Sequence, residues 1–130
     1  TNLEVICTFI FEQTIHGDYR TMMGVTPEEM AHACLKAGAN IIGANCGNGF
    51  KRMVDIVKEI RKAAPTAPIL VHANAGMPLI KEAITVYPDT PEMMSAIVPD
   101  LVSAGAQIIG GCCGTTPAHI KAIASAVKEL

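Results

Sequence analysis

Apolar and polar residues follow the same order four times along the chain: a strand-like apolar run, then a segment with helical spacing. The strand-like runs cover residues 3–11, 40–45, 69–73 and 107–111. The helical segments follow Thr26, begin at Phe50, and follow Thr90 and Thr116. Strands that alternate with helices in this way are joined by right-handed βαβ crossovers. The pattern therefore predicts an α/β protein with a parallel sheet.

The helix boundaries are marked by capping residues. Thr26-Pro27-Glu28 and Thr90-Pro91-Glu92 each combine an N-cap threonine, a proline in the first turn and an acidic residue near the positive end of the helix dipole. The third helix is expected to end near Gly105 and to kink at Pro99. Residues 76–90 carry no regular pattern and are expected to form a long loop.

Residues 37–46 (AGANIIGANC) and 104–113 (AGAQIIGGCC) are near-repeats of one βα unit. Four such units cannot close an eight-stranded barrel, so two strand edges are expected to lie open. The inward apolar side chains would then lack an opposing wall; we expect these to be Val5, Ile41, Leu70 and Ile108. The chain is therefore predicted to need a partner, either a missing half or a second copy of itself.

Composition narrows the class of protein. Half of the 130 residues are hydrophobic and the net charge is −2, with no basic run, which argues against a nucleic-acid or anionic-membrane surface. No apolar stretch is long enough to span a membrane, and we expect no signal peptide. The five cysteines, two of them adjacent, do not suit a disulfide framework. We therefore expect a reducing, cytoplasmic location.

Three cysteines fall where predicted strands end. Cys46 follows the second strand, and Cys112 and Cys113 follow the fourth at the equivalent place in the repeat. Because parallel strands direct their carboxyl ends into one shared site, the three thiolates are predicted to hold one zinc ion with an open fourth position. The alternative for the adjacent pair is two small core residues in a tight turn, and Cys46 alone would also suit a core position.

A zinc ion held by three thiolates suits the binding of another sulfur. A substrate thiol can enter the open position, lose its proton and remain nucleophilic toward a methyl group.

The residues that carry this chemistry resemble a known family. The run from Gly110 to Ile120 (GGCCGTTPAHI) looks like the zinc signature of the homocysteine S-methyltransferases, which include the homocysteine-binding domain of cobalamin-dependent methionine synthase. Asn45-Cys46 resembles the family's upstream ligand motif, and Asn74-Ala75-Gly76 followed by TVYP resembles the loop between the cysteine strands.

The resemblance covers essentially the whole chain. It implies that residues 1–130 are the C-terminal half, strands five to eight with their helices, of a TIM-type (β/α)₈ barrel. It also implies zinc on Cys46, Cys112 and Cys113, with Asn74 as a fourth ligand that the substrate displaces. Strands one to four, which carry other substrate contacts in the family, are absent from this chain.

The remaining candidates have plainer alternatives. Asn74 either serves the site or caps a turn, and Tyr87 either contacts substrate or anchors its loop. Thr8, near the end of the first strand, is a further substrate-contact candidate, as is Glu12 more weakly. We assign Cys7 and Cys34 to the core. His16, His32 and His119 are assigned to the surface, and His72 is either a catalytic base or ligand or a satisfied neighbour of the strand end.

The leading functional hypothesis is zinc-dependent methyl transfer to homocysteine or a close thiol or selenol. The methyl donor stays open among a methyl-corrinoid (cobalamin), a betaine-like ammonium and a sulfonium. The main alternative is a non-catalytic half-barrel that binds zinc or a partner. A structural zinc site is a weaker alternative, because such sites close all four positions with protein ligands.

Overall fold

A four-stranded parallel sheet forms the centre of the computed structural model, which describes residues 2–47 and 49–130. Thr1 and Asn48, both inside the predicted domain, lie outside the described residues. The strand order is β1-β4-β5-β8, and every neighbouring pair is parallel. The sheet strands are β1 (Ile6–Phe9), β4 (Ile41–Cys46), β5 (Ile69–Ala73) and β8 (Ile108–Gly111). This is the predicted fold class, a (βα)₄ half of a TIM-type barrel.

The helices are α1 (Pro27–Lys36), α2 (Phe50–Ala63), α3 (Pro91–Ala96), α4 (Val98–Ala104) and α5 (Pro117–Lys128). The predicted capping at Thr26 is confirmed: its hydroxyl accepts a hydrogen bond from the Glu29 N–H at 3.2 Å, and the Glu29 carboxylate accepts one from the Thr26 N–H at 2.8 Å. The predicted interruption near Pro99 divides the third helix into α3 and α4 at Ile97.

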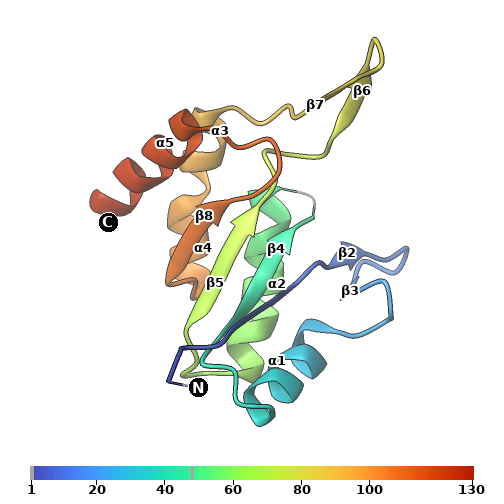
Figure 1. Ribbon diagram of the computed structural model, residues 1–130, viewed down its shortest axis with the longest axis vertical. Helices are drawn as coiled ribbons and strands as arrows, with labels where there is room; N and C mark the ends of the chain where they lie inside the picture. Colours follow the sequence, from blue (N-terminus) through green and yellow to red (C-terminus); the bar gives the residue numbers. More distant parts are fainter. Residues whose placement is uncertain (1, 48) are drawn as a thin grey trace.

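Two antiparallel hairpins extend from this framework (Figure 1). One pairs β2 (Glu12–Gln13) with β3 (Tyr19–Arg20), and the other pairs β6 (Leu79–Lys81) with β7 (Ile84–Val86). The second hairpin corrects the expected long loop over residues 76–90. Its two turn residues, Glu82 and Ala83, both have positive φ (48° and 64°), as a type I′ turn requires. Neither residue type signals such a turn, which is why the sequence pattern missed it.

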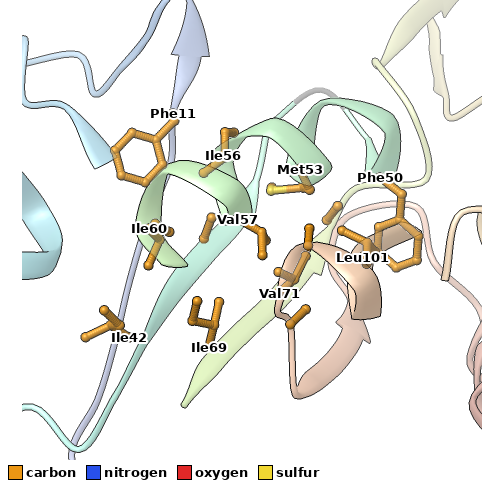
Figure 2. Close-up of a cluster of buried hydrophobic side chains, with 14 of the residues drawn as sticks. Phe11, Ile42, Phe50, Met53, Ile56, Val57, Ile60, Ile69, Val71 and Leu101 are labelled. Carbon is orange, nitrogen blue, oxygen red and sulfur yellow. The ribbon is translucent and has the colours of Figure 1, made fainter. Parts of the chain in front are cut away.

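The core lies between the sheet and its helices. Ile42, Ile69 and Val71 point from the sheet to the helix side and are fully buried. They pack against α2, whose Val57 and Ile60 are also fully buried (Figure 2). Burial of alternate strand residues follows from the pleat, which directs successive side chains to opposite faces of the sheet.

The opposite face of the sheet, called here the inner face, carries alternate side chains from each strand. Ile6 is paired with Ile41, and Leu70 with Ile108. Ile6 is 54% exposed and Ile108 is 39% exposed. The register corrects one expectation: Ile6, rather than Val5, shares the inner face with Ile41, because a shift of one residue moves a side chain across the sheet.

Within the described residues, no helix is long and apolar enough to cross a membrane.

The exposed inner face generates a prediction about assembly. Apolar burial contributes roughly 25 cal/mol per Å², so an isolated chain of residues 1–130 should associate through this face. Light scattering after size-exclusion chromatography should show a species larger than a monomer. Ile6→Lys combined with Ile108→Lys should shift it toward monomer, whereas Ile15→Lys, a change at a 96% exposed loop position, should not. A wild-type monomer with a cooperative melt would show that the open face needs no cover.

Candidate metal centre

The three candidate cysteines lie together at the carboxyl edge of the sheet. Cys46 ends β4 opposite Ala73 of β5, and Ala73 is in turn opposite Gly111, the last residue of β8. The sulfur atoms of Cys46, Cys112 and Cys113 all lie within 4.8 Å of one another. The Sγ–Sγ distance is 2.9 Å between Cys46 and Cys112 and 3.8 Å between Cys112 and Cys113.

The backbone around the cysteines is shaped for this convergence. Cys46 has a φ of 54°, in the left-handed region that non-glycine residues rarely adopt, and Gly47 follows with a φ of 64°. After the adjacent cysteines, Gly114 has a φ of 78°, and the Tyr87 ring occupies the place where a β-carbon on Gly114 would lie. Only glycine fits at position 114. Strained residues of this kind concentrate at functional sites.

Asn74 connects the two cysteine segments. Its side-chain Nδ2–H donates to the Gly47 carbonyl at 3.1 Å, and its Oδ1 accepts from the Cys113 N–H at 3.1 Å. Its own backbone N–H donates to the Cys46 carbonyl at 3.3 Å. Asn74 is 8% exposed, so these bonds are made away from bulk water. The side chain therefore braces the segment after β4 against the segment after β8.

The pKa values of the two closest thiols, Cys46 and Cys112, are shifted in opposite directions. Burial tends to raise the pKa of the Cys46 thiol, but hydrogen bonds from Cys112, Asn45 and Cys113 together lower it below its ordinary value. Burial first, and then the hydrogen bond with Cys46, raise the pKa of the Cys112 thiol to about 11. Of the two thiols, Cys46 is therefore the one that loses its proton more readily, with Cys112 as the donor of the hydrogen bond between them. Thiols that lose their protons become the thiolates that bind soft cations.

The sulfur geometry is compatible with zinc. Zinc–thiolate bonds of about 2.3 Å in tetrahedral arrangement place sulfurs about 3.8 Å apart. The Cys112–Cys113 separation of 3.8 Å matches this spacing, whereas the Cys46–Cys112 contact of 2.9 Å would have to open by about 0.9 Å. Three soft ligands that leave one side open suit a zinc ion with an exchangeable fourth position.

The other sequence candidates lie at different distances from this cluster. Tyr87 is adjacent to it. The pKa of the Tyr87 phenol is raised mainly by burial, and to a smaller extent by the charge of Cys113 and a hydrogen bond with it. Thr8 lies on the inner face opposite Gly43 and, together with Asn45, lines a cavity of about 630 Å³. His72 also lies on the inner face, opposite Asn45, and burial lowers its pKa, which favours the neutral imidazole.

A cavity of about 380 Å³ opens beside Cys46 and Asn74. Glu12 and Arg52 contribute charged groups to its lining, and Met77 contributes an apolar one. Arg52 and Met77 were not singled out from the sequence, because their neighbours in the chain give no sign that α2 and the β5–β6 connection face the same space.

His119 corrects a sequence assignment. It is buried, at 7% exposed, rather than a surface residue. Its Nδ1 accepts from the Thr116 N–H at 3.1 Å and its Nε2 lies 2.9 Å from the Asp89 carbonyl oxygen. A histidine therefore takes the position that Glu or Gln occupies in an ordinary capping box. The core assignment of Cys34 is confirmed; Cys7 is half-buried, and the two sulfurs lie 3.5 Å apart.

The chain is similar in sequence and in fold to methionine synthases and homocysteine methyltransferases. The chain is 36% identical over 94 residues to methionine synthase from Mycobacterium tuberculosis, covering 72% of this chain and 8% of that protein. It is 34% identical over 122 residues to homocysteine S-methyltransferase 2 from Saccharomyces cerevisiae, covering 88% of this chain and 37% of that protein. The fold is similar to the apo crystal structure of the homocysteine methyltransferase MmuM from Escherichia coli, with a TM-score of 0.63 at 21% identity, covering 82% of this chain and 34% of MmuM.

The parallel half-barrel and the thiol cluster at its carboxyl edge define this protein as an α/β barrel-type chain with a candidate metal centre. Residues 1–127 match the homocysteine S-methyltransferase family, and the chain belongs to that family. It spans little more than a third of the yeast relative and less than a tenth of the mycobacterial one.

The brace formed by Asn74 generates a stability prediction. Asn74→Ala leaves the Cys113 N–H and the Gly47 carbonyl without their partners, so the free energy of unfolding of the full natural protein should fall by about 2–3 kcal/mol. Asn40→Ala is the matched control, because Asn40 is exposed and accepts one hydrogen bond, from the Val5 N–H. Urea denaturation should give a clearly larger loss at position 74. Equal losses of unfolding free energy at positions 74 and 40 would mean that the Asn74 bonds stabilise the protein no more than an exposed hydrogen bond does.

Proposed function

We propose that this chain supplies the C-terminal half, strands five to eight, of the (β/α)₈ barrel of a homocysteine S-methyltransferase and holds its zinc ion through Cys46, Cys112 and Cys113. The observation that carries the proposal is the convergence of three sulfurs within 4.8 Å at the carboxyl edge of a parallel sheet. Active sites of barrel enzymes lie at that edge. Family membership supports methyl transfer to homocysteine as the reaction.

The chain's own residues divide the work. Cys46, Cys112 and Cys113 provide three anionic ligands, and Asn74 fixes the distance between the segments that carry them. When bound, zinc supplies the positive charge that lowers the pKa of the substrate thiol and keeps the resulting thiolate in place. The deprotonated sulfur then attacks the methyl carbon of the donor, and the leaving group departs with the bonding electron pair.

The substrate-binding assignments follow from position. Asn74 lines the cavity beside Cys46, and its Oδ1, which accepts from the Cys113 N–H, is our candidate for the displaceable fourth ligand. Tyr87 lies against Gly114 and borders the thiols. Thr8 lies farther along the inner face and would contact the substrate only in the closed barrel. For the methyl donor we keep a methyl-corrinoid, an ammonium and a sulfonium, with the methionine synthase relative supporting the corrinoid.

A second candidate function is a zinc-binding half-barrel that is inactive until a partner covers it. The exposed inner face favours this candidate, because Ile6 and Ile108 have no opposing wall within the described residues. The partner would be the missing N-terminal half or a second copy of the chain.

Zinc content tests the metal assignment. The full natural protein should bind one zinc ion at this site, and Cys112→Ala should lose most of it, because two thiolates hold zinc poorly. Cys7→Ala, which removes a thiol on the helix side of the sheet, should keep the metal. Wild-type affinity should also rise with pH, since the Cys112 proton, with a pKa of about 11, must leave on binding. Undiminished zinc in Cys112→Ala would remove the basis of the proposal.

Proton release on homocysteine binding tests the mechanism. A free thiol with a pKa of about 8.5 is largely protonated at pH 7, so binding as a thiolate should release close to one proton. Calorimetry of the zinc-loaded protein in buffers of different ionisation enthalpy measures this number. Methionine, whose sulfur has no proton to lose, is the control ligand and should give buffer-independent heats. Buffer-independent heats with homocysteine would contradict thiolate formation.

A further inference from the structure

Asn45 makes a direct contact with one sulfur of the cluster. Its side-chain Nδ2–H donates to the Cys46 sulfur at 3.3 Å. Among the hydrogen bonds of residues 2–47 and 49–130, no other side-chain amide donates to a sulfur of the cluster. The Cys112 sulfur lies 2.9 Å from the Cys46 sulfur and 3.8 Å from the Cys113 sulfur. The three thiols are therefore electronically unequal.

We propose that Asn45 is a positioning residue that suppresses the nucleophilicity of the Cys46 sulfur and so directs the methyl group to the substrate sulfur. The inference rests on the proposed function. In that function, three protein thiolates and one substrate thiolate surround the same ion, and all four are the same kind of nucleophile. Something must keep the protein's own sulfurs from taking the methyl group.

Methylation of a protein cysteine would damage the site. Attack by any of the four sulfurs forms an S–CH₃ bond and breaks the bond from the methyl carbon to its leaving group, which keeps the electron pair. If Cys46 attacked, it would become a neutral thioether and a poor zinc ligand. A hydrogen bond stabilises a thiolate and withdraws the lone pair that would attack, so its donor lowers the reactivity of that sulfur.

The position of Asn45 fits this role. It lies on the inner face, opposite His72 in the register of β4 and β5, and lines the cavity that also contains Thr8. It is therefore on the side of Cys46 that faces the barrel interior. In the proposed role, the Asn45 N–H occupies a lone pair on that side of Cys46 and so makes it less available to an incoming methyl group. Cys113, in contrast, is exposed.

The test uses methyl iodide as a simple methylating probe on the full natural protein loaded with zinc, without homocysteine. Mass spectrometry of peptides measures the ratio of methylation at Cys46 to that at Cys113, which serves as an internal reference. Asn45→Ala and the isosteric Asn45→Asp, whose carboxylate cannot donate, should each raise the ratio by about threefold to tenfold. Asn40→Ala, at the other end of the sheet, should leave it unchanged.

Zinc is measured in the same samples, so that failure of the Asn45 role can be distinguished from failure of the proposed function. An unchanged ratio in zinc-loaded variants would overturn the role of Asn45 while leaving the proposed function intact. Loss of zinc from both variants would overturn it as well, because Asn45 would then hold the site together rather than discriminate between sulfurs. A wild-type protein without zinc would overturn the proposed function itself.

Discussion

The hydrogen bonds that β5 makes beyond its own end hold the rest of the site in place. The Ala73 carbonyl accepts from the Cys112 N–H at 2.8 Å, and the Ala75 N–H donates to the Cys113 carbonyl at 2.9 Å. Asn74, between them, bonds to both cysteine segments through its side chain. The parallel ladder is thus prolonged past the strands, and the cysteines are fixed by backbone geometry rather than by the sulfurs themselves. A thiol cluster built in this way can exist before any metal arrives.

That arrangement places strict demands on small residues around the cluster. Adjacent cysteines in an extended strand would point to opposite faces of the sheet, so both can reach one centre only if the chain turns directly after β8. The left-handed Gly114 completes this turn, and the Thr115 hydroxyl supports it by donating to the Cys112 carbonyl at 2.6 Å. The Tyr87 ring then fills the space that a side chain at position 114 would need. The run of glycines and cysteines is therefore a geometric requirement as much as a chemical one.

Much of this was predictable from the sequence, and the failures have physical causes. The parallel order follows from alternating periodicities, and the meeting of the cysteines follows from their equivalent places in a repeat. The β6–β7 hairpin was missed because Glu82 and Ala83 adopt a turn normally reserved for Asn and Gly. His119 was misplaced because its burial depends on the Asp89 carbonyl, thirty residues away in the chain. Val5 was assigned to the wrong face because a strand's period of two leaves no tolerance for a register error of one.

The site and its enclosure are separable in this chain. All three proposed metal ligands and their brace come from the last residue of β4 and from the segments that follow β5 and β8, so the donor set needs no other part of a barrel. The inner face is different: Ile6 and Ile108 remain exposed, and Thr8 lines a cavity that is open to solvent. Exclusion of water is what strengthens charge interactions around a reacting thiolate and prevents side reactions. The proposed donor set is therefore contained in this half, whereas the proposed methyl transfer would depend on whatever covers the inner face.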